Sequence, residues 1–308
     1  MGIRNLAAGA TMLLTLACAS SPERPAIQLV KTVQAEAPLP PSATLTYLGV
    51  AGWSLQSGEH TMLFDPYVTR SAVDEDFDTV VVPDGSAIAR FVPRRAELVV
   101  VSHSHFDHAL DVPEIALRTG AAVLGTSSTA ELARASHVPE PQIVAVSGGE
   151  ELVFGSFRVR AVKALHSLTG VPNLPIAHRP RLPMRARDYH EGGTLQYFVR
   201  FGDRTLYFIG TANLNEGQLK GMHADIAIVA LGLRHKVPDY TCKLLRALGL
   251  PKLVLPNHFD AWQEPLHPGQ MTLSEETQAD LADFEDEVHA CAPEAHVITP
   301  VWLEPIAL

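Results

Sequence analysis

The alternation of apolar and polar positions predicts strands and helices that follow one another along most of the chain. Residues 98–102 form a continuous apolar run, which is typical of a strand buried on both faces. Shorter runs predict further strands at 44–50, 61–64, 122–124, 143–146, 151–154, 157–164, 194–201, 205–209, 226–230, 253–255, 296–299 and 301–303, with 52–58 connecting the first hairpin. Helical patterns cover 109–118, 128–135 and 240–248, and a capping box, Thr272-Leu-Ser-Glu275, opens a helix to about residue 290. Because strands in both halves are followed by helices, we expect an α/β fold of two packed sheets with helices outside.

The first 17 residues are predicted to be a signal peptide rather than part of the fold. Arg4 supplies a positive charge, and residues 6–17 form an apolar and small-residue run that is too short to span a membrane comfortably. The segment ends at Cys18, and Leu16-Ala17-Cys18 resembles a bacterial lipoprotein signal, which implies lipidation of Cys18. Simple secretion is the alternative. The expected location is the bacterial cell envelope, as an outer-membrane lipoprotein or a periplasmic protein, with a lipid anchor as the only membrane attachment.

A proline-rich tether is expected to join the signal to the folded part of the chain. Residues 18–42 contain five prolines, and such a stretch favours an extended conformation. Residues 43–308 then form one domain, with no internal repeat and no second long hydrophobic stretch.

The composition excludes several classes of protein. Of the 308 residues, 46% are hydrophobic and 19% are charged, as in an ordinary globular protein. The net charge of −10 provides no overall field to attract nucleic acid, so no nucleic-acid partner is expected. Three cysteines are too few for a disulfide framework, and Cys242 and Cys291 are interpreted as packing residues.

A histidine-rich motif directly after the apolar run is the main chemical signal. The segment 102–108 reads SHSHFDH, so His103, His105, Asp107 and His108 fall within six residues between a buried strand and a helix. The carboxyl end of such a strand is where open α/β sheets place their sites. Imidazole and carboxylate ligands suit zinc, and also iron or manganese. The motif therefore predicts a metal site.

These residues make the chain resemble the metallo-β-lactamase-fold superfamily. Residues 46–53 (TYLGVAGW) and 63–66 (LFDP) resemble the first hairpin of the branch that holds ascorbate-phosphate lactonase and N-acyl phosphatidylethanolamine phospholipase D. The resemblance covers residues 43–308 and implies a four-layer αββα sandwich. It also implies two further ligands after later strands: His166 in VKALHS and His258 in LVLPNHFD.

The resemblance divides the ligands between two metal ions. His103, His105 and His166 would hold the first, and Asp107, His108 and His258 the second. Such metals lower the pKa of water to about 7 and clamp a substrate, which implies hydrolysis of an ester, lactone, amide or phosphoester. Asp107 is also the candidate catalytic residue, because with an empty second site it would orient the water or carry a proton.

One ligand of the family is missing. The family has a bridging Asp where this chain has Thr211, and a neutral hydroxyl is a poorer ligand for a dication. Three outcomes are open: one tight and one weak metal, compensation by Asn213 or Glu191, or loss of hydrolytic activity. The alternative function is thus a non-catalytic or weakly active metal-binding lipoprotein.

Two loops are expected to shape specificity. Residues 171–191 carry Arg179, Arg181, Arg185 and Arg187, which would either receive an anion or form a solvated surface. Arg234 and His235, with Lys236, follow strand 226–230 and are candidate substrate contacts or proton donors. The expected substrate is a small or lipid-like molecule, with an anionic group as one option. A β-lactamase proper and a nuclease are less favoured, because of the missing Asp and the acidic charge respectively.

Overall fold

The computed structural model describes residues 28–29, 43–176 and 178–308. The predicted signal peptide and Cys18 lie outside the described residues. Within the predicted tether, β1 (Gln28–Leu29) pairs antiparallel with β9 (Glu151–Phe154). No helix among the described residues is both long enough and apolar enough to cross a membrane.

One sheet has seven strands and contains the amino-terminal half of the domain. Its order is β17 (Pro305–Ala307), β2 (Ala43–Gly49), β3 (Gly52–Ser57), β4 (His60–Phe64), β6 (Leu98–Val100), β7 (Ala122–Gly125) and β8 (Ile143–Ala145). The first four strands are antiparallel neighbours, and β4, β6, β7 and β8 are parallel. The carboxyl ends of β4 and β6 therefore lie at the same edge.

The second sheet has eight strands and contains most of the carboxyl-terminal half. Its order is β1, β9, β10 (Phe157–Lys163), β12 (Leu195–Phe201), β13 (Arg204–Ile209), β14 (Ile226–Ala230), β15 (Leu253–Asn257) and β16 (His296–Val297). The strands from β13 onward are parallel. A small separate ribbon pairs β5 (Val80–Val81) with β11 (Met184–Arg185).

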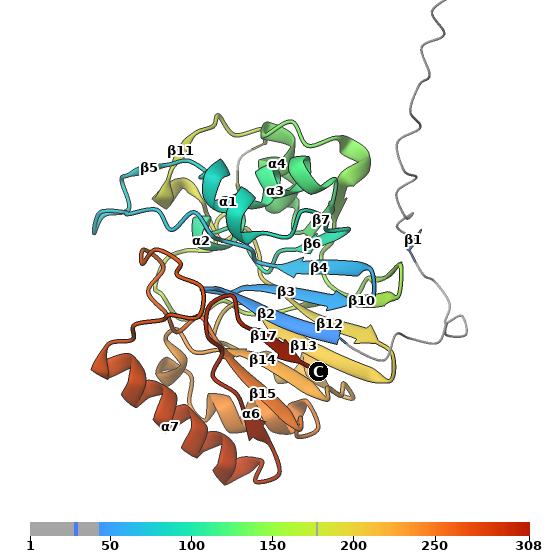
Figure 1. The fold of residues 1–308 in the computed structure, drawn as a ribbon, viewed down its shortest axis with the longest axis vertical. Helices are drawn as coiled ribbons and strands as arrows, with labels where there is room; N and C mark the ends of the chain where they lie inside the picture. The colour runs from blue at the N-terminus through green and yellow to red at the C-terminus, as the bar shows by residue number, and fades with distance from the viewer. Residues whose placement is uncertain (1–27, 30–42, 177) are drawn as a thin grey trace, which may run out of the picture.

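The two sheets pack against each other through an apolar core. Phe64 of the first sheet meets Phe208 of the second, with ring centroids 4.9 Å apart. The helices α1 (Gly85–Phe91), α2 (Phe106–Ala109), α3 (Val112–Thr119) and α4 (Ser127–Ala135) lie on the side of the first sheet, and α6 (Tyr240–Ala247) and α7 (Glu275–Cys291) on the side of the second (Figure 1). The shorter elements are α5 (Glu216–Leu219), η1 (Glu140–Gln142), η2 (Ala186–Asp188) and η3 (Arg234–Lys236). The expected four-layer αββα arrangement is confirmed.

The structure differs locally from the sequence-based prediction. Residues 52–57, expected as a connection, form the full strand β3, which pairs with β2 and β4 on its two edges and buries every residue except Gln56. The helix expected at 109–118 is two helices, α2 and α3. The cap of α7 is Ser274 rather than Thr272, since the Ser274 side chain accepts the backbone N–H of Thr277. The strand predicted at 301–303 is reduced to an isolated bridge between Tyr47 and Trp302.

Candidate metal centre

Three histidines meet where β6 and β10 end. His103 follows β6, His105 caps α2 and His166 follows β10. The Nε2 atom of His103 lies 3.0 Å from Nδ1 of His105 and 3.1 Å from Nε2 of His166. The three nitrogen atoms thus face one common point.

The partners behind two of these rings indicate which nitrogen carries the proton. Nδ1 of His166 lies 3.0 Å from the carbonyl oxygen of Ser167, which can only accept, so this nitrogen is the donor. Nδ1 of His103 lies 3.0 Å from Oγ of Ser102, whose own hydrogen goes to Asp65. Both Nε2 atoms therefore carry lone pairs, and two lone pairs 3.1 Å apart repel each other. A cation between them removes that repulsion.

A second cluster consists of Asp107, His108 and His258. Asp107 Oδ2 lies 3.3 Å from Nε2 of His258 and 3.5 Å from Nε2 of His108. Helix α2 supplies the first two residues, and His258 follows β15. The rings of His103 and His108 are 3.9 Å apart, so the two clusters are immediate neighbours.

Asp65 supports the second cluster from behind. This fully buried carboxylate lies 2.7 Å from Nδ1 of His108, accepts the backbone N–H of Ser102 at 2.6 Å and also accepts the Ser102 hydroxyl. The contact directs Nε2 of His108 toward Asp107. Gly210 makes room for it, because a Cβ there would lie 2.3 Å from Asp65 Oδ2. Asp65 was expected only as part of the first hairpin, although its place at the end of a strand parallel to β6 is a signal for a site residue.

Burial sets the charge of these groups. It lowers the pKa of His103 well below 6.5, that of His105 to about 3 and that of His166 to about 4. The first cluster is therefore neutral and ready to bind a cation at pH 7. Burial raises the pKa of Asp107, but His108 and His258 outweigh it and lower that pKa below its usual value. Burial likewise opposes the charge of His108, yet Asp107 and Asp65 raise its pKa, which reveals the negative potential of the second cluster.

The residues present fit metal ions in both clusters. The three groups of His and acidic side chains with metal-binding geometry among residues 43–176 and 178–308 all lie here. Three neutral imidazoles form one donor set, and a carboxylate with two imidazoles forms the other, as zinc, iron and manganese sites require. The structure thus brings together the six predicted ligands.

Thr211 does not replace the missing carboxylate. It follows β13 and is buried, and its hydroxyl accepts the backbone N–H of Ser167 at 3.0 Å and pairs with Ser167 Oγ at 2.7 Å. Its polar atom therefore holds the loop that carries His166.

The two residues considered as substitutes for that carboxylate are engaged elsewhere. Nδ2 of Asn213 donates to the carbonyl of His166 at 2.8 Å. Glu191 Oε1 accepts hydrogen bonds from Asn173 and Thr194, and Glu191 belongs to none of the candidate ligand groups. Neither side chain takes the place of the bridge.

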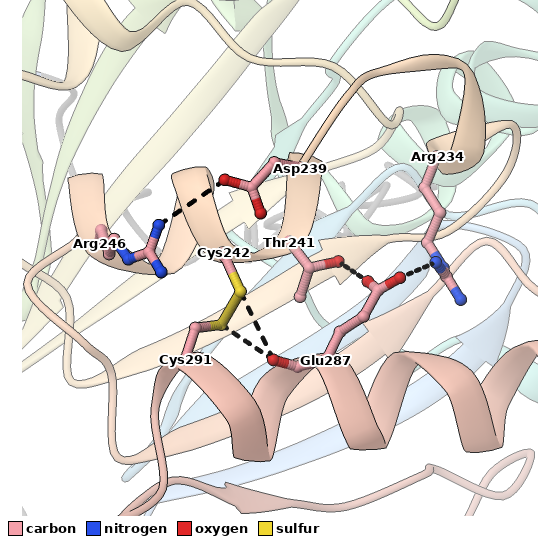
Figure 2. Close-up of a disulfide and its surroundings, with 7 residues drawn as sticks. All are labelled: Arg234, Asp239, Thr241, Cys242, Arg246, Glu287 and Cys291. Atoms are coloured by element: carbon pink, nitrogen blue, oxygen red, sulfur yellow. Dashed lines mark hydrogen bonds and ion pairs between the residues drawn. A yellow bond between two sulfur atoms is a disulfide. The ribbon is translucent and has the colours of Figure 1, made fainter.

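The loop after β14 borders both clusters, but two of its predicted contacts face elsewhere. Gly232 accepts Ser167 Oγ at 3.1 Å, and a Cβ at Gly232 would lie 3.4 Å from Nδ1 of His258. The Arg234 side chain is buried and donates to Glu287 of α7 at 2.9 Å (Figure 2). His235 Nε2 lies 2.6 Å from Asp280 of the same helix.

Carboxylates of α7 thus pair with both Arg234 and His235, and their role as substrate contacts or proton donors stays a prediction. Lys236 differs from them. It is exposed, and its Nζ donates to the carbonyl of Leu168, two residues after His166, at 3.1 Å.

The structure corrects the interpretation of two cysteines as packing residues. Cys242 of α6 and Cys291 of α7 form a disulfide beside the Glu287–Thr241 contact (Figure 2). The two positions are 49 residues apart and meet only because the helices pack side by side.

The arginine-rich loop is partly neutralised by the protein itself. Arg185 and Arg187 form ion pairs with Asp78 at 3.0 and 2.7 Å. These two half-exposed side chains therefore share one carboxylate beside the β5–β11 ribbon.

Comparisons with known proteins place this geometry in context. Residues 44–258 match the beta-lactamase superfamily domain. A "UPF0173 metal-dependent hydrolase" of Heliobacterium modesticaldum is 24% identical over 81% of this chain and 94% of its own length. A solved metallo hydrolase from Ignicoccus hospitalis has a TM-score of 0.57 at 19% identity, covering 87% of this chain and 98% of that one. A diiron beta-hydroxylase from Streptomyces venezuelae also has a TM-score of 0.57, at 16% identity, covering 88% and 55%.

Proposed function

The chain belongs to the beta-lactamase superfamily, and on that premise we propose that it is a metal-dependent hydrolase acting on an ester, lactone or phosphoester bond. The observation that carries the proposal is the meeting of two neighbouring ligand clusters. In the first, three imidazole nitrogen atoms face one point, and in the second, the Asp107 carboxylate faces two imidazoles. The curated relative named as a metal-dependent hydrolase supports the same reaction class. Zinc is the proposed metal because five of the six ligands are imidazoles; iron and manganese are the alternatives.

Each side chain has a defined task in this proposal. Metal ions bound here supply Lewis acidity, which activates water at neutral pH and polarises the substrate. His103, His105 and His166 would hold the first ion, and Asp107, His108 and His258 would hold the second. With an empty second site, the Asp107 carboxylate would instead orient the attacking water or carry its proton.

The surface beside His166 supports a substrate with an apolar group. The exposed large hydrophobic residues of the two loops next to the site are Leu165, Leu168, Val171, Leu174 and Leu233. The Ser167–Gly232 and Lys236–Leu168 hydrogen bonds join these loops into one rim. Exposed apolar side chains gathered at a polar site mark ligand contact, and Lys236 adds a cation for an anionic group. We therefore propose a small or lipid-like ester with an acidic group.

The first test measures metal and turnover in the same preparation. Protein purified without chelator should contain metal and hydrolyse aryl and acyl esters, lactones or phosphodiesters. His103→Ala and His105→Ala should lose the tightest metal and the activity, because each removes a direct ligand. His289→Ala, at an exposed position of α7, is the matched control. Full metal content in the His103 or His105 variants, at equal folding, would contradict the assignment.

The second test addresses the substrate. Leu168→Ser and Leu233→Ser should raise KM for esters of long acyl chains while leaving acetate esters unchanged. Lys236→Ala should weaken only substrates with an anionic group. Equal KM changes for short and long neutral esters would argue against the apolar rim.

The alternative, a non-catalytic or weakly active metal-binding lipoprotein, is favoured by Thr211. Its hydroxyl is committed to Ser167, which leaves the two clusters without a bridging carboxylate. Stable metal content without turnover on any of these substrate classes would select this alternative.

We also propose export to the cell envelope, with Cys18 as the lipidated residue of an outer-membrane lipoprotein. The Cys242–Cys291 disulfide supports export, since disulfides persist in oxidising compartments such as the periplasm. Cys18→Ser should move the protein from the membrane fraction to the soluble periplasmic fraction. Membrane recovery equal to that of the unmodified sequence would contradict lipidation.

A further inference from the structure

His258 holds its position with an unusual backbone conformation. Its φ is +56°, in the left-handed region that residues with a Cβ seldom adopt. Such a conformation persists only where the surroundings determine it. The first restraint is a hydrogen bond that the backbone N–H of His258 donates to the carbonyl oxygen of Val50 at 2.6 Å.

A second restraint comes from the residue just before this turn. Asn257 accepts the indole N–H of Trp53 at 3.1 Å and donates to the carbonyl of Ile209 at 3.1 Å. These contacts tie the end of β15 to β3 of the first sheet and to β13 of its own sheet.

The third restraint is Asp260, two residues after His258. One carboxylate oxygen accepts the backbone N–H of Val50 at 2.8 Å and lies 2.6 Å from the Tyr47 hydroxyl. The other accepts Arg70 Nη2 at 3.0 Å and Trp302 Nε1 at 2.8 Å. The Asp260 side chain is 1% exposed, so all four contacts are made away from water.

Arg70 holds the same turn through two hydrogen bonds. Its Nη2 bonds Asp260 and its Nη1 donates to the carbonyl of Ala261 at 2.9 Å, so the two residues after Phe259 are both held. The guanidinium passes directly over Gly49, where a Cβ would lie 1.5 Å from Nη2. A glycine at position 49 is thus required for Arg70 to reach Asp260 and Ala261.

Asp260 and its four partners, Tyr47, Val50, Arg70 and Trp302, form a hub that connects three distant parts of the chain to the turn. Tyr47 and Val50 belong to the first hairpin, Arg70 follows β4 and Trp302 lies near the carboxyl end. Each of them reaches the short segment that carries His258, and none of them touches the first histidine cluster in any recorded contact of the described residues.

We infer that Asp260 is a positioning residue for the second metal: it fixes the 258–261 turn and so keeps His258 Nε2 directed at Asp107. The inference rests on the proposed metal-dependent function. Without the four contacts to Asp260, the turn relaxes from its left-handed geometry and the second cluster loses one imidazole. The first cluster, built on β6, α2 and β10, keeps its ligands.

Asp260→Asn tests this by calorimetric titration of zinc into the chelator-treated full chain. Asparagine keeps the size of the side chain but turns an amide N–H₂ toward donors. Removing the partner that orients a metal ligand costs about 10- to 100-fold in metal affinity. We expect a loss in that range for the weaker zinc and less than a twofold change for the tighter one.

Further variants separate positioning from general destabilisation. Tyr47→Phe and Trp302→Phe each remove one donor while keeping an aromatic ring, and each should weaken the second zinc by a smaller factor. Gln142→Leu removes a different buried side chain, which bonds the carbonyl of Ala121, and should leave both zinc affinities unchanged at a comparable loss of stability. If Asp260→Asn does not fold, the two single-donor variants carry the test.

The outcomes distinguish the inference from the proposed function. If the original sequence binds two zinc ions and the hub variants bind them with unchanged affinities, the inference is overturned and the proposed function is not. Equal weakening of both ions in Asp260→Asn, or weakening of the second ion in Gln142→Leu, would also overturn it. Normal zinc titrations without hydrolysis would refute the proposed reaction and leave the inference standing. An original sequence that binds no metal would overturn both.

Discussion

The carboxylate of Asp65 lies 2.7 Å from Nδ1 of His108, although the two residues are 43 positions apart. Both side chains are buried, and the contact sets the orientation of the ring whose other nitrogen faces Asp107. Asp65→Asn should lower the affinity for the second metal by about 10- to 100-fold, because a neutral partner makes the imidazole a weaker donor. Competition with a chromophoric chelator measures this. Asp203→Asn, in an exposed turn, is the control, and equal affinities in the two variants would contradict the role of Asp65.

Thr211 predicts unequal metal sites. The first cluster keeps three imidazoles, while the second keeps one carboxylate and two imidazoles without a bridge, so we expect one tight zinc and one that fills only at higher concentration. Thr211→Asp should tighten the second zinc, because it adds a negative charge at the position where the family resemblance implies the bridging carboxylate. Calorimetric titration of both proteins gives the answer. Two equally tight ions in the original sequence would show that another group serves as the bridge.

Asp111 predicts how stability depends on pH. Burial raises its pKa from 3.8 to about 6, although Val68 and Thr69 donate hydrogen bonds to it. The folded protein then binds more protons than the unfolded chain between about pH 4 and pH 6. This contribution is fully present below pH 4 and is lost as the pH rises through 6; it amounts to about 2–3 kcal/mol.

The measurement for Asp111 is urea unfolding of chelator-treated protein at pH 4 and pH 6.5. Asp111→Asn has no titrating group at this position, so its free energy of unfolding should decrease less over that interval than that of the original sequence. Parallel pH dependences in the two proteins would contradict the raised pKa. The histidine ligands titrate in both proteins and cancel in the comparison.

The Cys242–Cys291 disulfide should stabilise the fold without affecting metal binding. It closes a loop of 49 residues between α6 and α7, and such a cross-link restricts the unfolded chain by about 2–4 kcal/mol. Replacing both cysteines by serine should lower the free energy of unfolding by that amount under oxidising conditions. Metal content should stay unchanged, since the ligands come from other elements. A dithiol reductant should give the same loss in the original sequence and none in the double variant.

The strand pattern and the four-layer arrangement were predictable because buried strands and amphipathic helices leave a periodic signal. The errors occurred where tertiary contacts outweigh that signal. Residues 52–57 begin with a glycine and contain a polar glutamine, yet β2 and β4 provide hydrogen-bonding partners on both sides. Helix α1 was missed because it is short, and its start depends on Asp84, which accepts the N–H groups of Ser86 and Ala87.

The sequence alone determined the metal-ligand motif, because His103, His105, Asp107 and His108 are neighbours after one buried strand and need no distant partner to be recognised. Tertiary structure alone decided what the other polar groups do. Arg234 meets Glu287 across 53 positions, and the Cys242–Cys291 pair and the Asp65–His108 contact span similar distances. A buried charge or thiol is satisfied by whichever group the packing brings within about 3 Å. Strand order and helix docking choose that group, and sequence spacing does not encode it.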